Sequence, residues 1–319
     1  MIKRGSNPRT SFHVSPFLNL YYSMEASTGT IIEVYNEEYA EQMKEVLPKR
    51  ILERFKELHY SQRFSWRVKS CLFDEISEKK LRDSMLLLAN EFYQLLSEAF
   101  SFYEQYWEEV SPSLISARKV LETNKDQLED LSDMTSDLLQ IPWRCDVLHI
   151  QLVEPFTGEP IGENVIALGI GPIVSLPATE LATISYMFIS HEARHILVGD
   201  TIRKIAEKYT TEEHAEYIDE AVMNLIRGSL VKRKPEFQLK LRKAIKAAAE
   251  LKFPPPSYTG TPSTPEGEIW KARHERRNHY LGYYRELFQS DWEELLETKE
   301  PFPKVVEILL LRNREKIKR

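Results

Sequence analysis

The chain has 319 residues, of which 42% are hydrophobic and 29% charged, a composition typical of a folded globular protein and not of a disordered one. Its net charge of −6 argues against a nucleic-acid binder, and its two cysteines, Cys71 and Cys145, suggest neither a disulfide framework nor a CxxC zinc site. Because no apolar segment follows the charged N-terminus and no run approaches about eighteen apolar residues, we expect an intracellular, cytoplasmic protein without a membrane partner.

Residues 1–140 are predicted to form an N-terminal helical region. A short strand is expected over residues 11–15. Apolar and aromatic residues then repeat every three or four positions, the period of a helix with one buried face. The expected helices cover residues 16–24, 36–60 with a break at Pro48, 77–110, and 112–139 beginning at Ser111-Pro112. No acid–base cluster or phosphate loop occurs here, so we expect a helical layer without chemistry of its own.

The pattern changes after Ile141, and residues 141–228 are predicted to form a compact core with both strands and helices. Residues 147–153 and 164–170 are rich in β-branched and large apolar side chains, which predicts two strands joined by a turn-rich segment. The pair is expected to form an antiparallel ribbon or part of a small sheet. One helix is expected from about Ala178 to Val198 with Gly199 as its stop, and another from Thr210 to about Arg227 with Gly228 after it.

Residues 229–319 are predicted to form a C-terminal helical region. It comprises a basic helical stretch (229–252), a proline-rich loop (253–265), a helix (266–290) and a tail (301–319) that continues as an apolar helix. The basic stretch carries no interleaved aromatic residues, so a solvated helix face explains it better than a nucleic-acid surface. The fold class expected for the whole chain is α+β and predominantly helical.

The chemistry of the chain centres on His191-Glu-Ala-Arg-His195. Two histidines four positions apart project from one face of a helix, so both imidazoles can bind one metal ion. Glu192 follows the first histidine and stands where it can take a proton from a water activated by the metal. The segment before the motif is apolar enough to be a buried helix. The pattern therefore predicts a catalytic zinc site.

A third protein ligand is needed, because a catalytic zinc site holds three protein ligands and leaves one position open. Glu220 lies on a predicted helix that turns Ile218 inward, and is the first candidate. Glu216, one turn earlier on a similar face, is the main alternative. Asn224, four residues after Glu220, is placed to donate a hydrogen bond to a ligand histidine.

His191-Glu-Ala-Arg-His195, followed after 23 intervening residues by Asp219-Glu-Ala-Val-Met-Asn224, resembles the gluzincins, the thermolysin-like clan of zinc peptidases. The resemblance covers about residues 145–228 and is nearest to the small, minimal gluzincins. It implies a zincin-like core between helical flanks, Zn²⁺ as cofactor, and His191, His195 and Glu220 as its ligands. Asn224 stands where the clan commonly has an aspartate.

The same resemblance implies an edge strand and an oxyanion donor. Strand 164–170 would pair with a bound peptide, with Asn164, Val165 and Ala167 as its substrate-facing residues. A Tyr or His from downstream would stabilise the oxyanion. The candidates, with His279 and Tyr283 preferred, are Tyr258, His279, Tyr280 and Tyr283.

The function expected is hydrolysis of a peptide or protein by an intracellular zinc peptidase, with Glu192 as the general base. The alternative is a non-catalytic zincin-fold module that binds zinc for stability. That alternative predicts a metal closed off by a fourth protein ligand, such as His214 or an acid from a flank.

Overall fold

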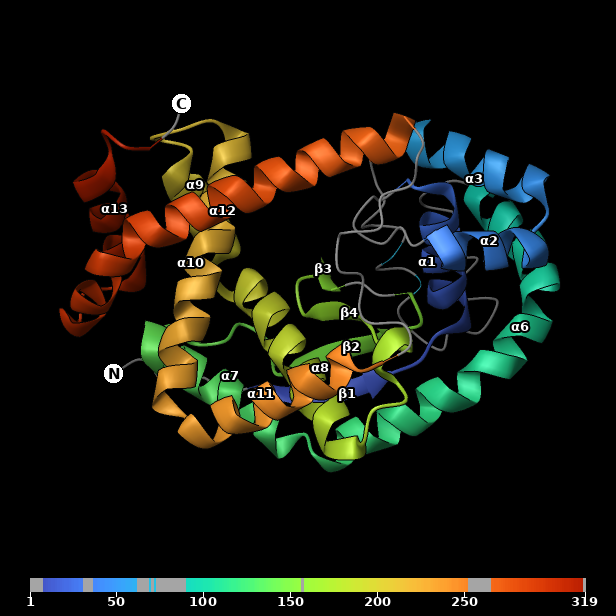
Figure 1. Cartoon of the computed structure of the whole chain (residues 1–319), viewed down its shortest axis with the longest axis horizontal. Helices are drawn as coiled ribbons and strands as arrows, with labels where there is room; N and C mark the ends of the chain where they lie inside the picture. Colours follow the sequence, from blue (N-terminus) through green and yellow to red (C-terminus); the bar gives the residue numbers. More distant parts are fainter. Residues whose placement is uncertain are drawn as a thin grey trace.

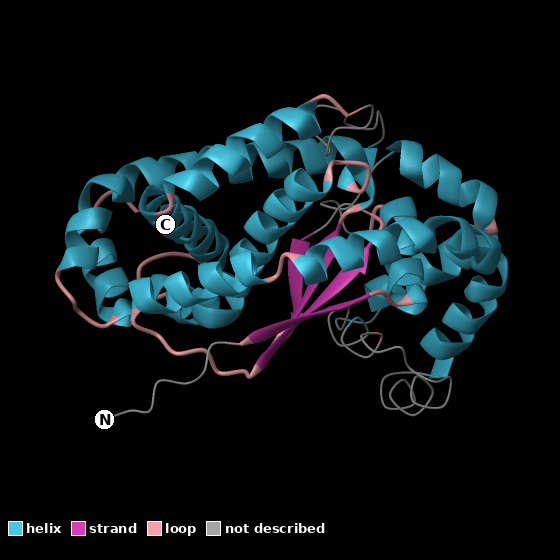
Figure 2. Cartoon of the chain, turned by 90° about the horizontal axis from the view of Figure 1, so that it is seen from below, coloured by secondary structure: helices cyan, strands magenta, loops and turns pink. Residues whose placement is uncertain are grey.

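A four-stranded sheet lies between two groups of helices in the computed structural model of the chain (Figures 1 and 2). The structure describes residues 8–30, 37–61, 69, 72, 90–155, 158–251 and 265–317. The strands are β1 (Arg9–His13), β2 (Val147–Val153), β3 (Gly158–Gly162) and β4 (Val165–Gly169). The helices are α1 (Pro16–Thr28), α2 (Glu37–Val46), α3 (Lys49–Ser61), α6 (Asn90–Thr123), α7 (Asp126–Leu139), α8 (Ala178–Arg194), α9 (Asp200–Ala206), α10 (Glu212–Arg233), α11 (Pro235–Ala249), α12 (Pro265–Glu297) and α13 (Phe302–Asn313). The α+β, predominantly helical fold class is confirmed.

The sheet has the order β1-β2-β4-β3, and its first three strands are parallel. The predicted antiparallel ribbon of residues 147–153 and 164–170 is therefore wrong, because β2 and β4 run in the same direction. The predicted turn-rich connection contains β3, which pairs antiparallel with β4 through a tight turn and brings β4 back beside β2. All five residues of β4 are buried, as expected for a strand with a neighbour on each side.

Each face of the sheet is covered by its own hydrophobic core. The N-terminal core is formed by buried residues of α1–α3 and the first half of α6, and it meets the sheet at Val153, Ile161, Val165 and Ala167. The C-terminal core is formed by α7–α13 and the second half of α6, and it meets the alternate residues Leu148, Ile150, Leu152, Ile166 and Leu168. Because β1 comes from residue 9 onward, the N-terminal region supplies part of the central sheet.

Three expected breaks in helices are absent from the described structure. α6 continues through Pro112, and α10 continues through Gly228. The helical backbone also continues through Gly199, because a π-helical segment (His195–Gly199) joins α8 directly to α9. Burial of side chains beyond each break, such as Leu114 and Leu121 in α6, offsets the local cost of about 3 kcal/mol for a proline and about 1 kcal/mol for a glycine in a helix.

Two helix starts do follow their local sequence. Ser15 caps α1 by accepting a hydrogen bond from the Leu18 backbone N–H, and Thr211 caps α10 by accepting one from His214 N–H. Most of the predicted loop 253–265 and the first part of the predicted helix 77–110 lie outside the described residues. Where the structure describes the chain, no helix combines the length and apolar character needed to cross a membrane.

Candidate metal centre

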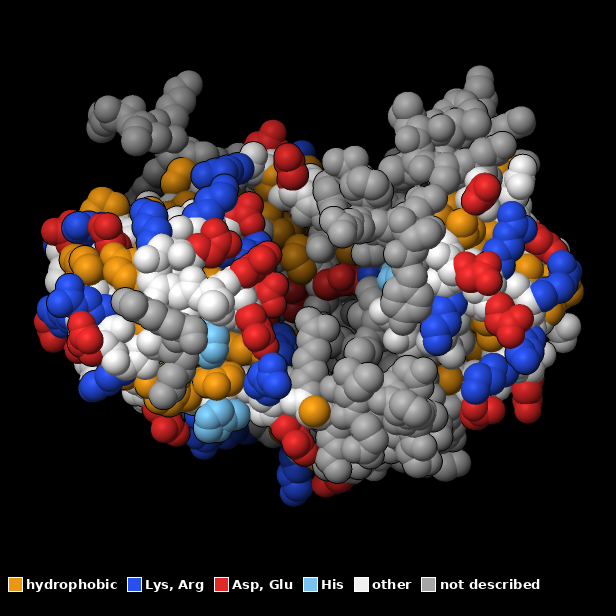
Figure 3. Space-filling model, turned by 90° about the horizontal axis from the view of Figure 1, so that it is seen from above, with side chains coloured by type: hydrophobic (Ala, Val, Ile, Leu, Met, Phe, Trp, Pro, Cys, Tyr) orange, Lys and Arg blue, Asp and Glu red, His pale blue; other side chains and the backbone are white. Residues whose placement is uncertain are grey.

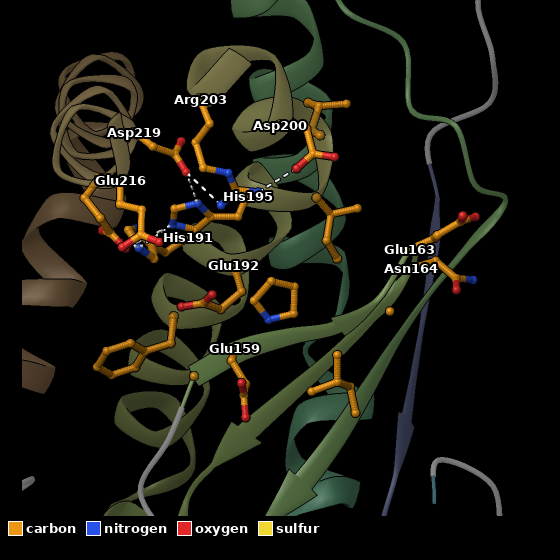
Figure 4. A pocket seen from close by; sticks show the side chains of 18 of the residues that line it. Glu159, Glu163, Asn164, His191, Glu192, His195, Asp200, Arg203, Glu216 and Asp219 are labelled. Atoms are coloured by element: carbon orange, nitrogen blue, oxygen red, sulfur yellow. Dashed lines mark hydrogen bonds and ion pairs between the residues drawn. The ribbon is translucent and has the colours of Figure 1, made fainter. Parts of the chain in front are cut away.

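His191 at the end of α8, His195 at the start of the π-helical segment and Glu220 of α10 converge on a single point. Figure 4 shows the two histidines side by side. The Nε2 atoms of His191 and His195 are 3.2 Å apart. Glu220 places Oε2 3.4 Å from His191 Nε2 and Oε1 3.5 Å from His195 Nε2. One ligand atom from each residue fits within a 4.8 Å span. Two imidazole nitrogens and a carboxylate oxygen form a donor set that suits zinc, so these residues fit a metal ion.

The charges of the three side chains depend on one another. Burial lowers the pKa of His191 to about 4, because its hydrogen bond to Glu220 compensates only in part. Burial acts in the same direction on His195, but hydrogen bonds to Asp219 and Glu220 outweigh it and raise its pKa to about 10. Burial raises the pKa of Glu220, yet hydrogen bonds from both histidines bring it well below its usual range. A proton on His195 thus balances the carboxylates, a role that a divalent cation can take over.

Asp219 contacts His195 at Nδ1, the ring nitrogen that faces away from the convergence point. Its Oδ2 atom accepts a hydrogen bond from His195 Nδ1 at 3.2 Å and lies 3.4 Å from Arg203 Nη1. Because Nδ1 donates to Asp219, Nε2 is the nitrogen that would give up its proton when a metal binds. Its lone pair would then face the convergence point, the arrangement found around histidine ligands of metals. Gly199 permits this approach, since a Cβ there would lie 3.3 Å from Asp219 Oδ2 and 3.4 Å from His195 Nδ1.

Asn224 does not have the predicted role. Its Nδ2 donates to the backbone carbonyl of Glu220 at 2.8 Å, one turn back along α10, and so stays on its own helix. The hydrogen bond to a ligand histidine that was expected of Asn224 is instead made by Asp219, for which the sequence predicted no such role. The signal was present in the Asp-Glu pair, but choosing between the two positions requires knowing how α10 faces α8.

Glu192 lies beside the ligands on the wall of the same cleft. It is 7% exposed, and its carboxylate makes no hydrogen bond or ion pair within the described parts of the chain. Burial raises its pKa to about 8, with the negative charges of Glu220 and Glu159 adding to the effect and His195 opposing it. Figure 4 shows Glu192 projecting from α8 toward the strand that carries Glu159. A carboxylate that is desolvated but faces a cleft is suited to exchanging protons with a bound reactant.

The strand at this edge of the sheet is β3, not the predicted strand 164–170. β4 lies between β2 and β3, so Asn164, Val165 and Ala167 cannot present a free edge to a peptide. The Asn164 amide donates to the Val147 carbonyl at 3.0 Å, and the other two side chains are buried in the N-terminal core. β3 packs against α8, and a Cβ at Gly158 would lie only 3.2 Å from Glu192 Oε1.

The predicted oxyanion donors lie away from the centre. His279 is exposed and packs against Tyr280, and neither residue lines the cleft. The Tyr283 hydroxyl donates to the Lys316 carbonyl at 2.5 Å, and Tyr258 lies outside the described residues. The residue of α12 that does reach the centre is Arg277, whose Nη2 donates to Glu220 Oε1 at 3.0 Å.

The other two candidate ligands, Glu216 and His214, lie apart from the converging residues. Glu216 is exposed on the wall of the cleft and is not one of the three converging ligands. His214 Nδ1 is 2.8 Å from the Tyr284 hydroxyl and likewise stands apart from them. Within the described residues, His191, His195 and Glu220 form the one group of metal-binding side chains that converges.

The centre opens into a cleft of about 2030 Å³, visible as the central hollow in Figure 3. Its walls come from β3, from the start of β2 and the residues before it, and from α8, α9, α10 and α12. Acidic side chains gather beside the hollow, and those that line it include Glu159, Glu163, Asp200, Glu212, Glu213 and Glu216. No model of a known protein family matches the chain, and no curated protein or solved structure was found to be similar to it.

Proposed function

We propose that the chain is a zinc-dependent peptidase. The observation that carries the proposal is the convergence of His191, His195 and Glu220, with Glu192 beside them, on the wall of an open cleft. The three residues would hold the metal. A bound zinc acts as a Lewis acid that polarises a carbonyl and lowers the pKa of water.

The protein's own residues would move protons and fix the geometry. Glu192 accepts the proton of the attacking water and returns it to the leaving amine. Its burial supports this role, because a carboxylate with a pKa near the working pH both takes and gives a proton readily. Asp219 keeps His195 in the tautomer that a metal ligand needs.

Two features favour a peptide over a small-molecule substrate. The cleft, at about 2030 Å³, is larger than the roughly 300–1,000 Å³ of ordinary small-molecule pockets. Its wall includes β3, which is an edge strand of the described sheet, and the backbone groups of an edge strand can pair with an extended peptide. Since Gly158 of β3 abuts Glu192, a peptide along this edge would pass close to the general base.

Arg277 takes the place of His279 and Tyr283 as the proposed oxyanion donor. It is anchored at the metal centre by its 3.0 Å hydrogen bond to Glu220, and its side chain is 31% exposed on the cleft wall. A guanidinium is a charged hydrogen-bond donor, the kind of group that stabilises a developing negative charge.

The experiment compares the wild type with Glu192→Gln, which keeps the shape of the side chain and removes its basicity. We expect both to bind one zinc per chain and only the wild type to cleave a library of peptides, with loss of at least ~100-fold in kcat for the variant. Glu216→Gln removes an exposed carboxylate from the same cleft and serves as the control that stays active. A wild type that binds no zinc, or that cleaves no faster than Glu192→Gln, rules the proposal out.

A further inference from the structure

Arg227 stands on the wall of the cleft, and no carboxylate of the described residues lies within ion-pair distance of it. It follows Glu220 by seven residues on α10, two helical turns, so both side chains leave nearly the same face of the helix. Arg227 lines the cleft and makes no hydrogen bond or ion pair with the residues that the structure describes. Arginines as enclosed as this one are ordinarily paired with a carboxylate.

Arg194 on α8 adds a second unpaired cation nearby. It is 1% exposed, and Nη1 donates to Ser190 Oγ at 2.9 Å, whereas Nε and Nη2 have no hydrogen-bond partner among the described residues. No described carboxylate lies within ion-pair distance of its guanidinium. Arg227 is close enough for the two positive charges to repel each other. Two cations that repel each other in a poorly solvated place are stabilised by an anion brought from outside.

The charge of the cleft wall therefore changes along α10, from negative at the N-terminal end of the helix to positive near Arg227. Acidic residues stand at its N-terminal end (Glu212, Glu213 and Glu216), and the proposed metal ligand Glu220 follows. The unpaired cation Arg227 lies beyond it. A peptide has the complementary polarity when a carboxylate occupies the Arg227 end. Seven helical residues span roughly 10 Å, the length of about three residues of extended peptide.

We propose that Arg227, with Arg194 behind it, binds a carboxylate of the substrate, and that the protein acts on peptides carrying this carboxylate within about three residues of the cleaved bond. The proposal rests on the proposed peptidase function. The carboxylate comes either from the C-terminus of the peptide or from an Asp or Glu side chain. Both sources offer two oxygens to the planar fork of a guanidinium.

The test measures binding to the zinc-loaded Glu192→Gln protein, in which the peptide is not consumed. Fluorescent peptides of one sequence are prepared with a free C-terminal carboxylate, with a C-terminal amide, and with an amide plus one Glu near the end. We expect the amide alone to bind at least ~10-fold more weakly than one of the two carboxylate forms. Which of the two binds tightly identifies the source of the carboxylate.

Variants of two arginines locate the contact. Arg227→Gln should abolish the difference between carboxylate and amide, and Arg227→Lys should keep part of it. Arg276→Gln is the matched control, because Arg276 lines the same cleft but pairs with Glu213 at 3.6 Å and should leave the difference intact. Equal binding of all peptides to the parent protein, no measurable binding of any, or equal losses in Arg227→Gln and Arg276→Gln overturns the proposal.

Failure of the two proposals can be told apart. If the wild type binds no zinc or cleaves no peptide, the peptidase function fails whatever the binding data show. If the wild type cleaves peptides but carboxylate and amide peptides bind equally well, only the proposed role of Arg227 is refuted.

Discussion

Removing the Asp219 carboxylate should weaken zinc binding although Asp219 is not a ligand. Its oxygen lies 3.2 Å from His195 Nδ1 and 3.4 Å from Arg203 Nη1, and the side chain is 2% exposed. In Asp219→Asn the amide oxygen still accepts a hydrogen bond, but the negative charge that makes His195 a stronger donor to the metal is lost. In Asp219→Ala both the charge and the acceptor are lost, and water cannot easily replace them at so buried a position.

Loss of such a supporting carboxylate weakens metal affinity by roughly 10- to 100-fold, equivalent to about 1.4–2.8 kcal/mol. We expect Asp219→Asn near the lower end of this range and Asp219→Ala near the upper end. Zinc affinity is measured by competition with a chelating dye, and circular dichroism of the metal-free proteins checks that they remain folded.

Glu216→Gln is the control for Asp219. It removes a carboxylate from the same helix, one turn earlier and exposed to solvent, and should leave zinc affinity unchanged. The reasoning is refuted if the Asp219 variants bind zinc as tightly as the wild type. It is refuted equally if Glu216→Gln loses as much affinity as they do, because Glu216 would then belong to the ligand set.

Three further substitutions test other parts of the structure. Gly158→Ala places a Cβ 3.2 Å from Glu192 Oε1, so that peptide cleavage should fall by roughly tenfold with zinc content unchanged. Gly228→Ala meets no atom within 4 Å inside a helix, and should raise the free energy of unfolding by about 0.5–1 kcal/mol in urea titrations. Burial raises the pKa of Glu25 to about 8 despite Lys69, so stability present below pH 4.5 is lost as the pH rises through 8. The melting temperature should therefore fall over this window, and Glu25→Gln should remove the fall; a parallel fall in the variant would contradict this.

The convergence of His191, His195 and Glu220 was predictable because it depends on local spacing. His191 and His195 share a helix face whatever the helix packs against, and the Asp-Glu pair marks a second helix with an acid at the right distance in sequence. The choice of Asp219 over Asn224 was not predictable in the same way. Residues 219 and 220 leave α10 about 100° apart, and only the packing of α8 against α10 directs one to His195 Nδ1 and the other to the Nε2 atoms.

Strand order and helix length depend on contacts that are distant in sequence. On one side β2 pairs with β1, which lies more than 130 residues earlier in the sequence. No local sequence pattern predicts that pairing. The identity of the edge strand follows from the same pairing, since a polar, glycine-rich segment such as β3 resembles a turn until its neighbour is known. α6 passes through Pro112 because residues on both sides are buried in different cores, and a single proline costs less than losing that burial.

The N-terminal region, expected to carry no chemistry of its own, makes hydrogen bonds to β3, the strand that forms one wall of the cleft. Glu159 of the edge strand accepts hydrogen bonds from the Tyr22 hydroxyl and from Lys69 Nζ, each at 2.5 Å, and Lys69 also pairs with the buried Glu25 at 2.9 Å. The wall with the ligands is built from the C-terminal core, whereas the wall with β3 is anchored to the N-terminal core. The distance between Glu192 and β3 is therefore set by how the two cores meet across the sheet. Residues 141–228 carry the ligands, but they lack β1 and the buried contacts to Glu159, so by themselves they do not contain the means to fix the cleft.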